Sequence, residues 1–164
     1  MSVRPACVLL LCGAIAAPLA AAPQTPTPKT AGAQAPAKKT LYERLGGYDG
    51  IAKIVDAFPP HLLGSDPKIP PMFTGLADTS KMRNRQLIVD QLCNLTGGPC
   101  LYIGRSMEAS HQGLEITEEM WKAQMKGWAD TMDEVKLKDP EKTELLAVID
   151  KLKDGIVQKK KDKG

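Results

Sequence analysis

The chain has 164 residues, enough for one compact domain with its own hydrophobic core. Its 22 Lys and Arg residues nearly balance 19 Asp and Glu residues, for a formal net charge of +3, which argues against nucleic acid as the main partner. The sequence contains no G-x-S-x-G, H-E-x-x-H or P-loop pattern, so it lacks the residues that nucleophilic, zinc-dependent and nucleotide-dependent chemistry require.

Residues 1–22 have the pattern of a secretory signal peptide. A single basic residue, Arg4, precedes an apolar run from Ala6 to Ala17, and small residues follow as far as Ala22. The run is shorter than the roughly 20 residues that a membrane-spanning helix needs, and no later segment comes closer. We therefore predict an exported protein, periplasmic or secreted, without stable membrane insertion.

Residues 23–39 are rich in Pro, Ala, Thr, Gln and Lys, and carry no aromatic side chain and no aliphatic one larger than alanine. Such a segment cannot bury enough apolar surface to fold, so we predict a disordered linker. The folded domain is then expected to cover residues 40–160.

From Thr40 onward the apolar residues recur at helical spacing, and alternation with a period of two is nowhere sustained, which predicts an all-α domain. Thr40 and Glu43 fit a capping box that opens a short helix over 41–45, ended by the two glycines 46–47. Asp49 is expected to cap the next helix. Because a proline removes a backbone donor and clashes with the preceding turn, Pro59 and Pro60 predict a kink or break near Phe58.

Asp66 and Pro67 are expected to start a brief helical turn, followed by a long helix over about 81–95. On that long helix one face combines Gln86 with three other residues, Met82, Val89 and Cys93, so that a glutamine lies within an apolar stripe. The adjoining face carries Ile88, Leu92 and Leu95.

A short helix over about 107–112 follows, with His111 in its last turn. Thr117 is expected to cap a long helix whose apolar residues recur at intervals of three and four. Asp139 and Pro140 start the last helix, in which the same spacing continues through the following residues: Leu145, Ile149, Leu152 and Ile156.

Two cysteines, Cys93 and Cys100, remain once the predicted signal peptide is removed. In an oxidising compartment they suggest one disulfide, because a tight Gly-Gly-Pro turn between them brings the chain back on itself. Two free thiols are the alternative. There is no C-x-x-C-H motif for a covalently attached haem, and two thiols alone rarely form a zinc site.

The histidines are His61 and His111, and neither has a dense cluster of acidic residues or cysteines near it in the sequence. A lone histidine is more often a structural residue than a metal ligand. Haem, however, needs one strong axial nitrogen, an apolar pocket, and a few cations or hydroxyls at its edge for the propionates. The chain carries all of these residue types.

The chain resembles the group 1 truncated haemoglobins over nearly all of residues 41–157. The resemblance rests on residues that occur in the family's order: 41–47 (LYERLGG), Phe58, Phe73, Gln86, 97–99 (GGP), Tyr102, Gly104, Met107, 111–113 (HQG) and 116–117 (IT). It implies a two-over-two helical sandwich, a haem cofactor, and a protein that reversibly binds oxygen or another diatomic gas, including nitric oxide for its removal. The alternative is an envelope redox or peroxidase-like haem enzyme with an unknown electron donor. The third hypothesis is a haem-free helical interaction module.

The resemblance also assigns roles to particular residues. His111 becomes the proximal iron ligand, and the carbonyl of Met107 is expected to accept its second N–H. Phe58 and Phe73 match apolar positions of the haem pocket, Phe73 on the haem face. Tyr102 and Arg85 are the preferred propionate contacts, ahead of two other arginines, Arg83 and Arg105.

One departure from the family affects the distal side. Family members commonly carry a tyrosine just after the phenylalanine that matches Phe58, and its hydroxyl bonds the gas ligand; here that position is Pro59. We therefore expect Gln86 to be the main donor to the ligand. The alternative is a side chain that binds the iron directly as a sixth ligand. The residues for that role are Met82, or His61 if the broken helix turns it inward.

Overall fold

The computed structural model describes residues 38–158, and every regular element in that range is an α-helix. The predicted signal peptide and most of the predicted linker lie outside the described residues. Eight helices are described: α1 (Leu41–Arg44), α2 (Gly47–Ser65), α3 (Ile69–Met72), α4 (Asp78–Leu95), α5 (Met107–His111), α6 (Glu118–Glu134), α7 (Glu141–Asp150) and α8 (Lys153–Ile156). Within this range none is long and apolar enough to cross a membrane.

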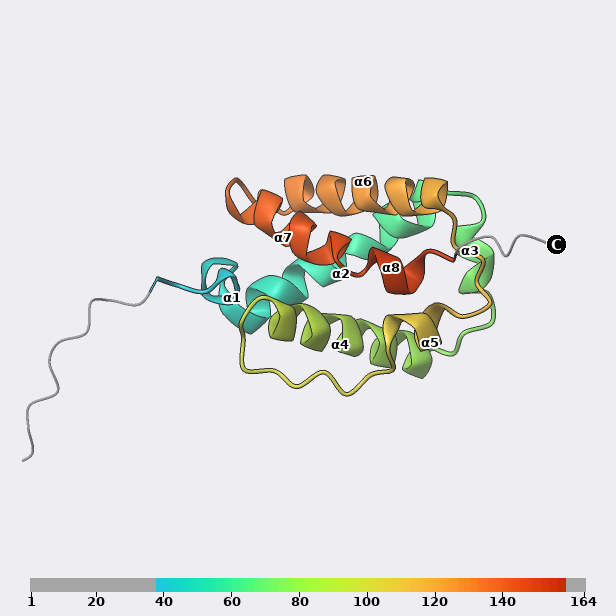
Figure 1. Ribbon diagram of the computed structural model, residues 1–164, viewed down its shortest axis with the longest axis horizontal. Helices are drawn as coiled ribbons and strands as arrows, with labels where there is room; N and C mark the ends of the chain where they lie inside the picture. The colour runs from blue at the N-terminus through green and yellow to red at the C-terminus, as the bar shows by residue number, and fades with distance from the viewer. Residues whose placement is uncertain (1–37, 159–164) are drawn as a thin grey trace, which may run out of the picture. The chain divides into compact units, whose positions relative to one another are not determined.

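The four long helices form two layers of two. Helix α2 packs against α4 in one layer, α6 packs against α7 in the other, and α2 crosses α6 between them (Figure 1). The short helix α5 lies beside α8 and follows the long loop that leaves the end of α4. This is the two-over-two sandwich that the sequence predicts.

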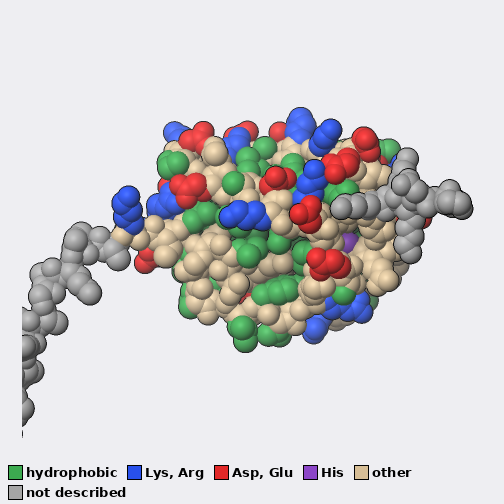
Figure 2. Space-filling view, viewed as in Figure 1, with side chains coloured by type: hydrophobic (Ala, Val, Ile, Leu, Met, Phe, Trp, Pro, Cys, Tyr) green, Lys and Arg blue, Asp and Glu red, His purple; other side chains and the backbone are tan. Residues whose placement is uncertain are grey.

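A contiguous apolar core lies between the layers. Its centre is the stacked pair Phe58 and Trp128, whose ring centroids are 3.5 Å apart with 8° between their planes. Burial of each large apolar side chain contributes about 1.5–3 kcal/mol, so this core dominates the stability of the domain. The outer surface is different: on the face seen in Figure 2, charged side chains of both signs are interspersed, as expected from the near-balanced composition.

Two predicted helix starts are confirmed by their caps. The Thr40 hydroxyl accepts the Glu43 backbone N–H at 3.2 Å, and the Glu43 carboxylate accepts the Thr40 N–H at 2.7 Å, which completes the capping box. Gly46 ends this first turn with a φ of +89°, a left-handed conformation that favours glycine. At α6, the Thr117 hydroxyl accepts the Met120 N–H at 3.3 Å.

Of the kink or break predicted near Phe58, the break does not occur. Helix α2 runs through Pro59 and Pro60 to Ser65. The two prolines remove two backbone donors, but Val55 and Phe58 are buried and the Phe58 ring is fixed on Trp128. This packing outweighs the helix-breaking tendency of the prolines.

Three helix boundaries also differ from the predictions. Gly46 rather than Asp49 precedes α2. The turn at Asp66 and Pro67 is not yet helical; the Asp66 carboxylate accepts the Lys68 N–H at 2.8 Å, and α3 begins afterwards. The last predicted helix is divided into α7 and α8 by a tighter turn, in which Leu152 N–H bonds the Ile149 carbonyl three residues back at 3.0 Å.

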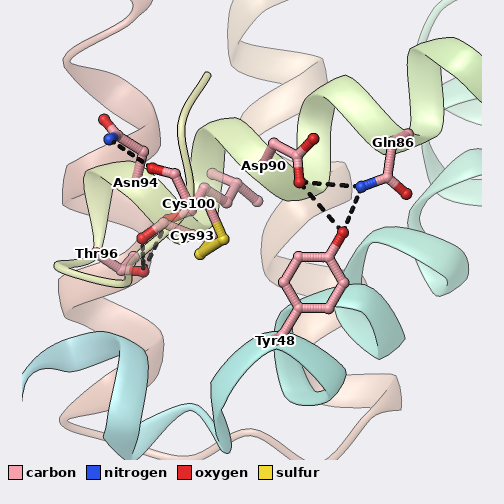
Figure 3. Close-up of a disulfide and its surroundings, with 8 residues drawn as sticks. Tyr48, Gln86, Asp90, Cys93, Asn94, Thr96 and Cys100 are labelled. Atoms are coloured by element: carbon pink, nitrogen blue, oxygen red, sulfur yellow. Dashed lines mark hydrogen bonds between the residues drawn. A yellow bond between two sulfur atoms is a disulfide. The ribbon is translucent and has the colours of Figure 1, made fainter. Parts of the chain in front are cut away.

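Cys93 and Cys100 form a disulfide, so of the two possibilities left open by the sequence the bridge is the one realised. Their Cα atoms are 5.7 Å apart, within the usual range for bridged cysteines. The turn between them is held by Gly98 N–H donating to the Cys93 carbonyl at 2.8 Å, and by the Asn94 amide donating to the Cys100 carbonyl at 3.0 Å (Figure 3). The bridge therefore anchors the loop that leads from α4 to α5.

Candidate functional site

His111 is the last residue of α5, a helix whose start is capped by the Ser106 hydroxyl accepting the Ala109 N–H at 3.2 Å. The imidazole Nδ1 lies 2.9 Å from the carbonyl oxygen of Met107, the acceptor predicted from the sequence. Because a carbonyl oxygen only accepts, Nδ1 donates; in the neutral imidazole, Nδ1 therefore carries the proton and Nε2 keeps its lone pair. This arrangement suits a metal ligand, whose second nitrogen is usually fixed by such a bond.

Helix α8 and the residues that follow it hold α5 in place from one side. The Gln158 amide donates to the His111 carbonyl at 2.7 Å, and the Gln158 backbone N–H donates to the Ile116 carbonyl at 3.0 Å. Gly155 allows the close approach, since a Cβ there would lie 2.8 Å from the Met107 Cβ. The position of the imidazole is therefore set by the carboxy-terminal helix as well as by its own.

His111 lines a hollow of about 360 Å³ that is partly open to the surface and is called the interior hollow below. The lining residues come from the two layers and from the short helices, and they are mostly large and apolar; they include Phe58, Leu62, Phe73, Ile88, Leu92, Trp121, Trp128, Ile149 and Ile156. None of the lining residues is Asp, Glu, Lys or Arg. The hollow is therefore an apolar chamber with one imidazole.

A second hollow, of about 280 Å³, lies beside the first and shares five of its residues, among them His111, Ile88 and Gln91. It reaches exposed parts of the chain at Arg83 and Arg105. Together the two hollows make a slot with an apolar interior and a cationic outer edge. A flat apolar group with acidic substituents on one side fits this distribution.

The face of α4 that lines the slot is the one that carries Ile88 and Gln91, not the one that carries Gln86. Gln86 donates its amide to the Asp90 carboxylate at 2.9 Å and to the Tyr48 hydroxyl, and Tyr48 in turn donates to Asp90 at 3.2 Å (Figure 3). The Gln86 amide is thus engaged by side chains of α2 and α4, although Gln86 and Ile88 both line a neighbouring hollow.

The expectation that Gln86 is the main ligand donor stays a prediction, and the engagement of its amide by Asp90 and Tyr48 does not favour it. Gln86 lines a third hollow, of about 730 Å³, formed by α2, α4 and the segment between them. This hollow shares five residues with the interior hollow, Ile88 among them, but neither His111 nor Gln91 lines it. The adjoining stripe of Ile88 and Leu92 is the sequence signal for the face toward His111, and it brings Gln91 into the slot three residues after Ile88.

Comparison with known proteins identifies the family. The model of a family described as Bacterial-like globin matches residues 40–158. Two proteins named group 1 truncated hemoglobin GlbN, from Nostoc sp. (strain MUN 8820) and Nostoc commune, are 32% and 30% identical over 93 residues, which span 57% of this chain and 75% of each relative. The chain belongs to the truncated haemoglobins.

Solved structures agree. Truncated hemoglobin from Tetrahymena pyriformis in its Fe(III) form has a TM-score of 0.65 and 26% identity, and the match covers 74% of this chain and all of that one. The 2/2 hemoglobin from Synechococcus sp. PCC 7002, solved in the cyanomet state with covalently attached heme, also has a TM-score of 0.65, at 22% identity over 74% of this chain and all of its own. The second likeness supports the fold alone.

The edge of the slot in this truncated haemoglobin differs from the sequence-based assignment. Arg85 lies outside the slot, where its guanidinium donates to both carboxylate oxygens of Asp56 at 2.7 and 2.8 Å and holds the pKa of that carboxyl below its usual range. Arg83 and Arg105 line the slot, and neither forms a salt bridge within the described part of the chain. Arg83 and Arg105, the less preferred candidates in the sequence, therefore line the slot, whereas Arg85 is paired with Asp56; which arginine contacts a propionate stays a prediction.

Tyr102 lines the same outer edge, and burial raises the pKa of its hydroxyl. That hydroxyl donates its proton to the Arg105 carbonyl at 2.7 Å, so it closes the loop and is not free to donate to a carboxylate. The aromatic ring packs over Gly104, where a side chain would collide with it. Tyr102 therefore shapes the loop that carries Arg105.

The remaining predicted positions divide into two groups. Phe58 and Phe73 line the interior hollow with His111, as the resemblance implies. Met82 is 71% exposed on α4, and His61 pairs through Nε2 with the Glu134 carboxylate at 2.7 Å. Neither Met82 nor His61 lines the slot, so the structure supports neither as a sixth iron ligand. Nor do three or more His, Cys, Asp or Glu side chains converge on a metal site anywhere in residues 38–158.

Proposed function

We propose that this truncated haemoglobin holds one haem in the slot between α4 and α5, with His111 as the proximal iron ligand, and binds oxygen or another diatomic gas reversibly. The observation that carries the proposal is the geometry of His111: Nδ1 is engaged by the Met107 carbonyl at 2.9 Å, Nε2 has no partner in the described residues, and the residue lines an apolar hollow. The haem iron supplies the coordination position at which the gas binds.

The chain's own residues hold the group and exclude water. Phe58, Phe73 and Ile88 offer apolar contact to a macrocycle in the interior. Arg83 and Arg105 are placed at the outer edge to pair with the propionates, in the positions that sequence reasoning gave to Arg85. The lining therefore matches haem in shape, polarity and ligand type.

A peroxidase-like enzyme is not favoured. Peroxide chemistry requires a second acid–base group near the iron, and the interior hollow contains no carboxylate, lysine or arginine and no histidine other than His111. The polar groups that remain in it are amides and one serine hydroxyl, which bind through hydrogen bonds without moving protons at neutral pH.

The test is an absorption spectrum of the purified protein in ferric, ferrous and carbon monoxide states. The proposal predicts a Soret band in all three and a reversible change when oxygen is admitted to the ferrous protein and then removed. A colourless protein that gives no Soret band after titration with hemin would contradict haem binding. Irreversible oxidation at the first exposure to oxygen would contradict reversible gas binding.

We also propose that the protein acts outside the cytoplasm. The support is the signal-like pattern of residues 1–22, together with the Cys93–Cys100 disulfide, which persists in oxidising compartments. Fractionation of cells that express the full chain, with amino-terminal sequencing of the product, tests this. Export predicts a processed protein in the periplasm or medium, and an unprocessed cytoplasmic protein would contradict it.

A further inference from the structure

The interior hollow contains two amide side chains, Gln91 of α4 and Gln124 of α6. Both are half-buried, and the side chain of neither has a hydrogen-bond partner within residues 38–158. Everything around them except a serine hydroxyl and His111 is apolar. Both amides therefore keep contact with solvent, since no buried side-chain N or O atom within residues 38–158 lacks a hydrogen-bond partner. A group that fills the hollow would remove that solvent, and buried polar groups are almost always hydrogen-bonded.

The position of Gln124 follows from the way α6 crosses α2. Trp121, Gln124 and Trp128 recur at intervals of three and four and all line the hollow, so they form one face of α6. Trp128 stacks on Phe58 of α2.

Gly127 fixes the crossing point, since a Cβ there would be 3.2 Å from the His61 carbonyl oxygen. The contacts Phe58–Trp128 and His61–Gly127 show that the two helices run in opposite directions. One turn further along each helix, Leu62 and Gln124 both line the hollow. Gln124 therefore lies at the wall made by α2 and α6, whereas His111 enters from α5, which packs on α8.

Gln91 and Gln124 differ in depth. Gln91 also lines the outer hollow with Arg83 and Arg105, so it belongs to the edge of the slot. Gln124 lines the inner hollow and not the outer one. Of the two amides, Gln124 is the one placed near the centre of a group that fills the slot.

We propose that Gln124 is the residue that donates a hydrogen bond to the diatomic gas and sets how long oxygen is retained. The proposal rests on the proposed function. When haem fills the hollow and displaces water, the Gln124 amide loses its solvent partners, and an unsatisfied amide there is costly. The gas ligand supplies an acceptor for it, in place of the missing donor at Pro59, whose side chain has no polar atom.

The proposal makes Gln124 a determinant of selectivity. A donor stabilises most the ligand that carries the most negative charge on its outer atom, so Gln124 favours oxygen over the less polarised carbon monoxide. Its loss is therefore expected to accelerate oxygen release much more than carbon monoxide release. A change in the size of the hollow would alter the release rates of oxygen and carbon monoxide together. Comparing the two rates therefore separates the effect of hydrogen-bond donation from that of packing.

The experiment compares Gln124→Leu and Gln124→Met with a matched control, Gln86→Leu, whose amide lies outside the slot. Gln91→Leu is measured alongside them. Each haem-loaded protein is examined by stopped-flow release of oxygen and of carbon monoxide, and by infrared measurement of the C–O stretch. One hydrogen bond of ordinary strength corresponds to about a threefold to tenfold change in rate.

We expect both Gln124 variants to release oxygen about threefold to tenfold faster, with less than about a twofold change for carbon monoxide and a higher C–O frequency. The Gln86 control keeps the parent's values. The proposal is overturned if both Gln124 variants keep the parent's oxygen rate and C–O frequency, or if Gln91→Leu alone accelerates oxygen release. In either case a Soret band and a carbon monoxide complex would leave the proposed function intact.

Discussion

Removing the Cys93–Cys100 bridge is expected to destabilise the domain by about 2.5 kcal/mol. The two cysteines are seven residues apart in the sequence, and closing so short a loop removes about 8 cal/mol/K of entropy from the unfolded chain. The bonds from Gly98 to Cys93 and from Asn94 to Cys100 do not involve sulfur, so the folded turn survives without the bridge. The loss therefore comes mainly from the unfolded state.

Urea unfolding of the parent and of Cys100→Ser measures this effect. With a urea dependence of about 1–3 kcal/mol/M, the midpoint is expected to fall by about 1 to 2.5 M. The control is a reducing agent, which should lower the parent's midpoint to that of the variant and leave the variant unchanged. A difference below about 0.3 M would refute the entropic argument, because it would correspond to less than about 1 kcal/mol.

Three further predictions concern the core, the slot edge and the Arg85–Asp56 ion pair. Phe58→Ala removes the ring stacked on Trp128 and is expected to lower the free energy of unfolding by about 3–5 kcal/mol, measured by urea unfolding; a loss under about 1 kcal/mol would show that the ring is dispensable. Arg105→Gln is expected to speed haem transfer to an acceptor apoglobin about two- to fivefold, as for an exposed ion pair, whereas Arg85→Gln leaves the rate unchanged; equal effects would contradict the assignment. Arg85→Gln is expected instead to cost no more than about 1 kcal/mol of stability. Because Arg85 lowers the Asp56 pKa below its usual 3.8, this stabilisation is fully present above that value and is lost as pH falls through the lower folded pKa. The free energy of unfolding is compared between the parent and Arg85→Gln over a pH series. A difference that persists at the lowest pH would contradict this cause.

Local signals predicted the elements well. The capping box at Thr40, the cap at Thr117 and the bond from His111 to the Met107 carbonyl each depend on residues within one helical turn. Such interactions are visible in the spacing of the sequence. The helical class follows from the same periodicity.

Features that depend on contacts between distant segments were not predictable in the same way. Helix α4 has two adjacent apolar stripes, and only packing against other helices decides that the stripe carrying Ile88 faces the slot. The sequence favoured the stripe carrying Gln86, whose amide instead bonds Asp90. Arg85 finds its carboxylate partner 29 residues earlier in the chain. Helix α2 continues through Pro59 because Phe58 is held by Trp128 of another layer.

The central claim, that His111 binds the haem iron, is tested most directly by titrating the protein with hemin in parallel with His111→Ala and His61→Ala. His61 is the matched control because its Nε2 pairs with Glu134 outside the slot. The account predicts that His61→Ala binds hemin with the parent's affinity and spectrum, and that His111→Ala loses most of its haem and the parent's ferrous spectrum. A His111→Ala protein that keeps the parent's affinity and ferrous deoxy spectrum would contradict the account.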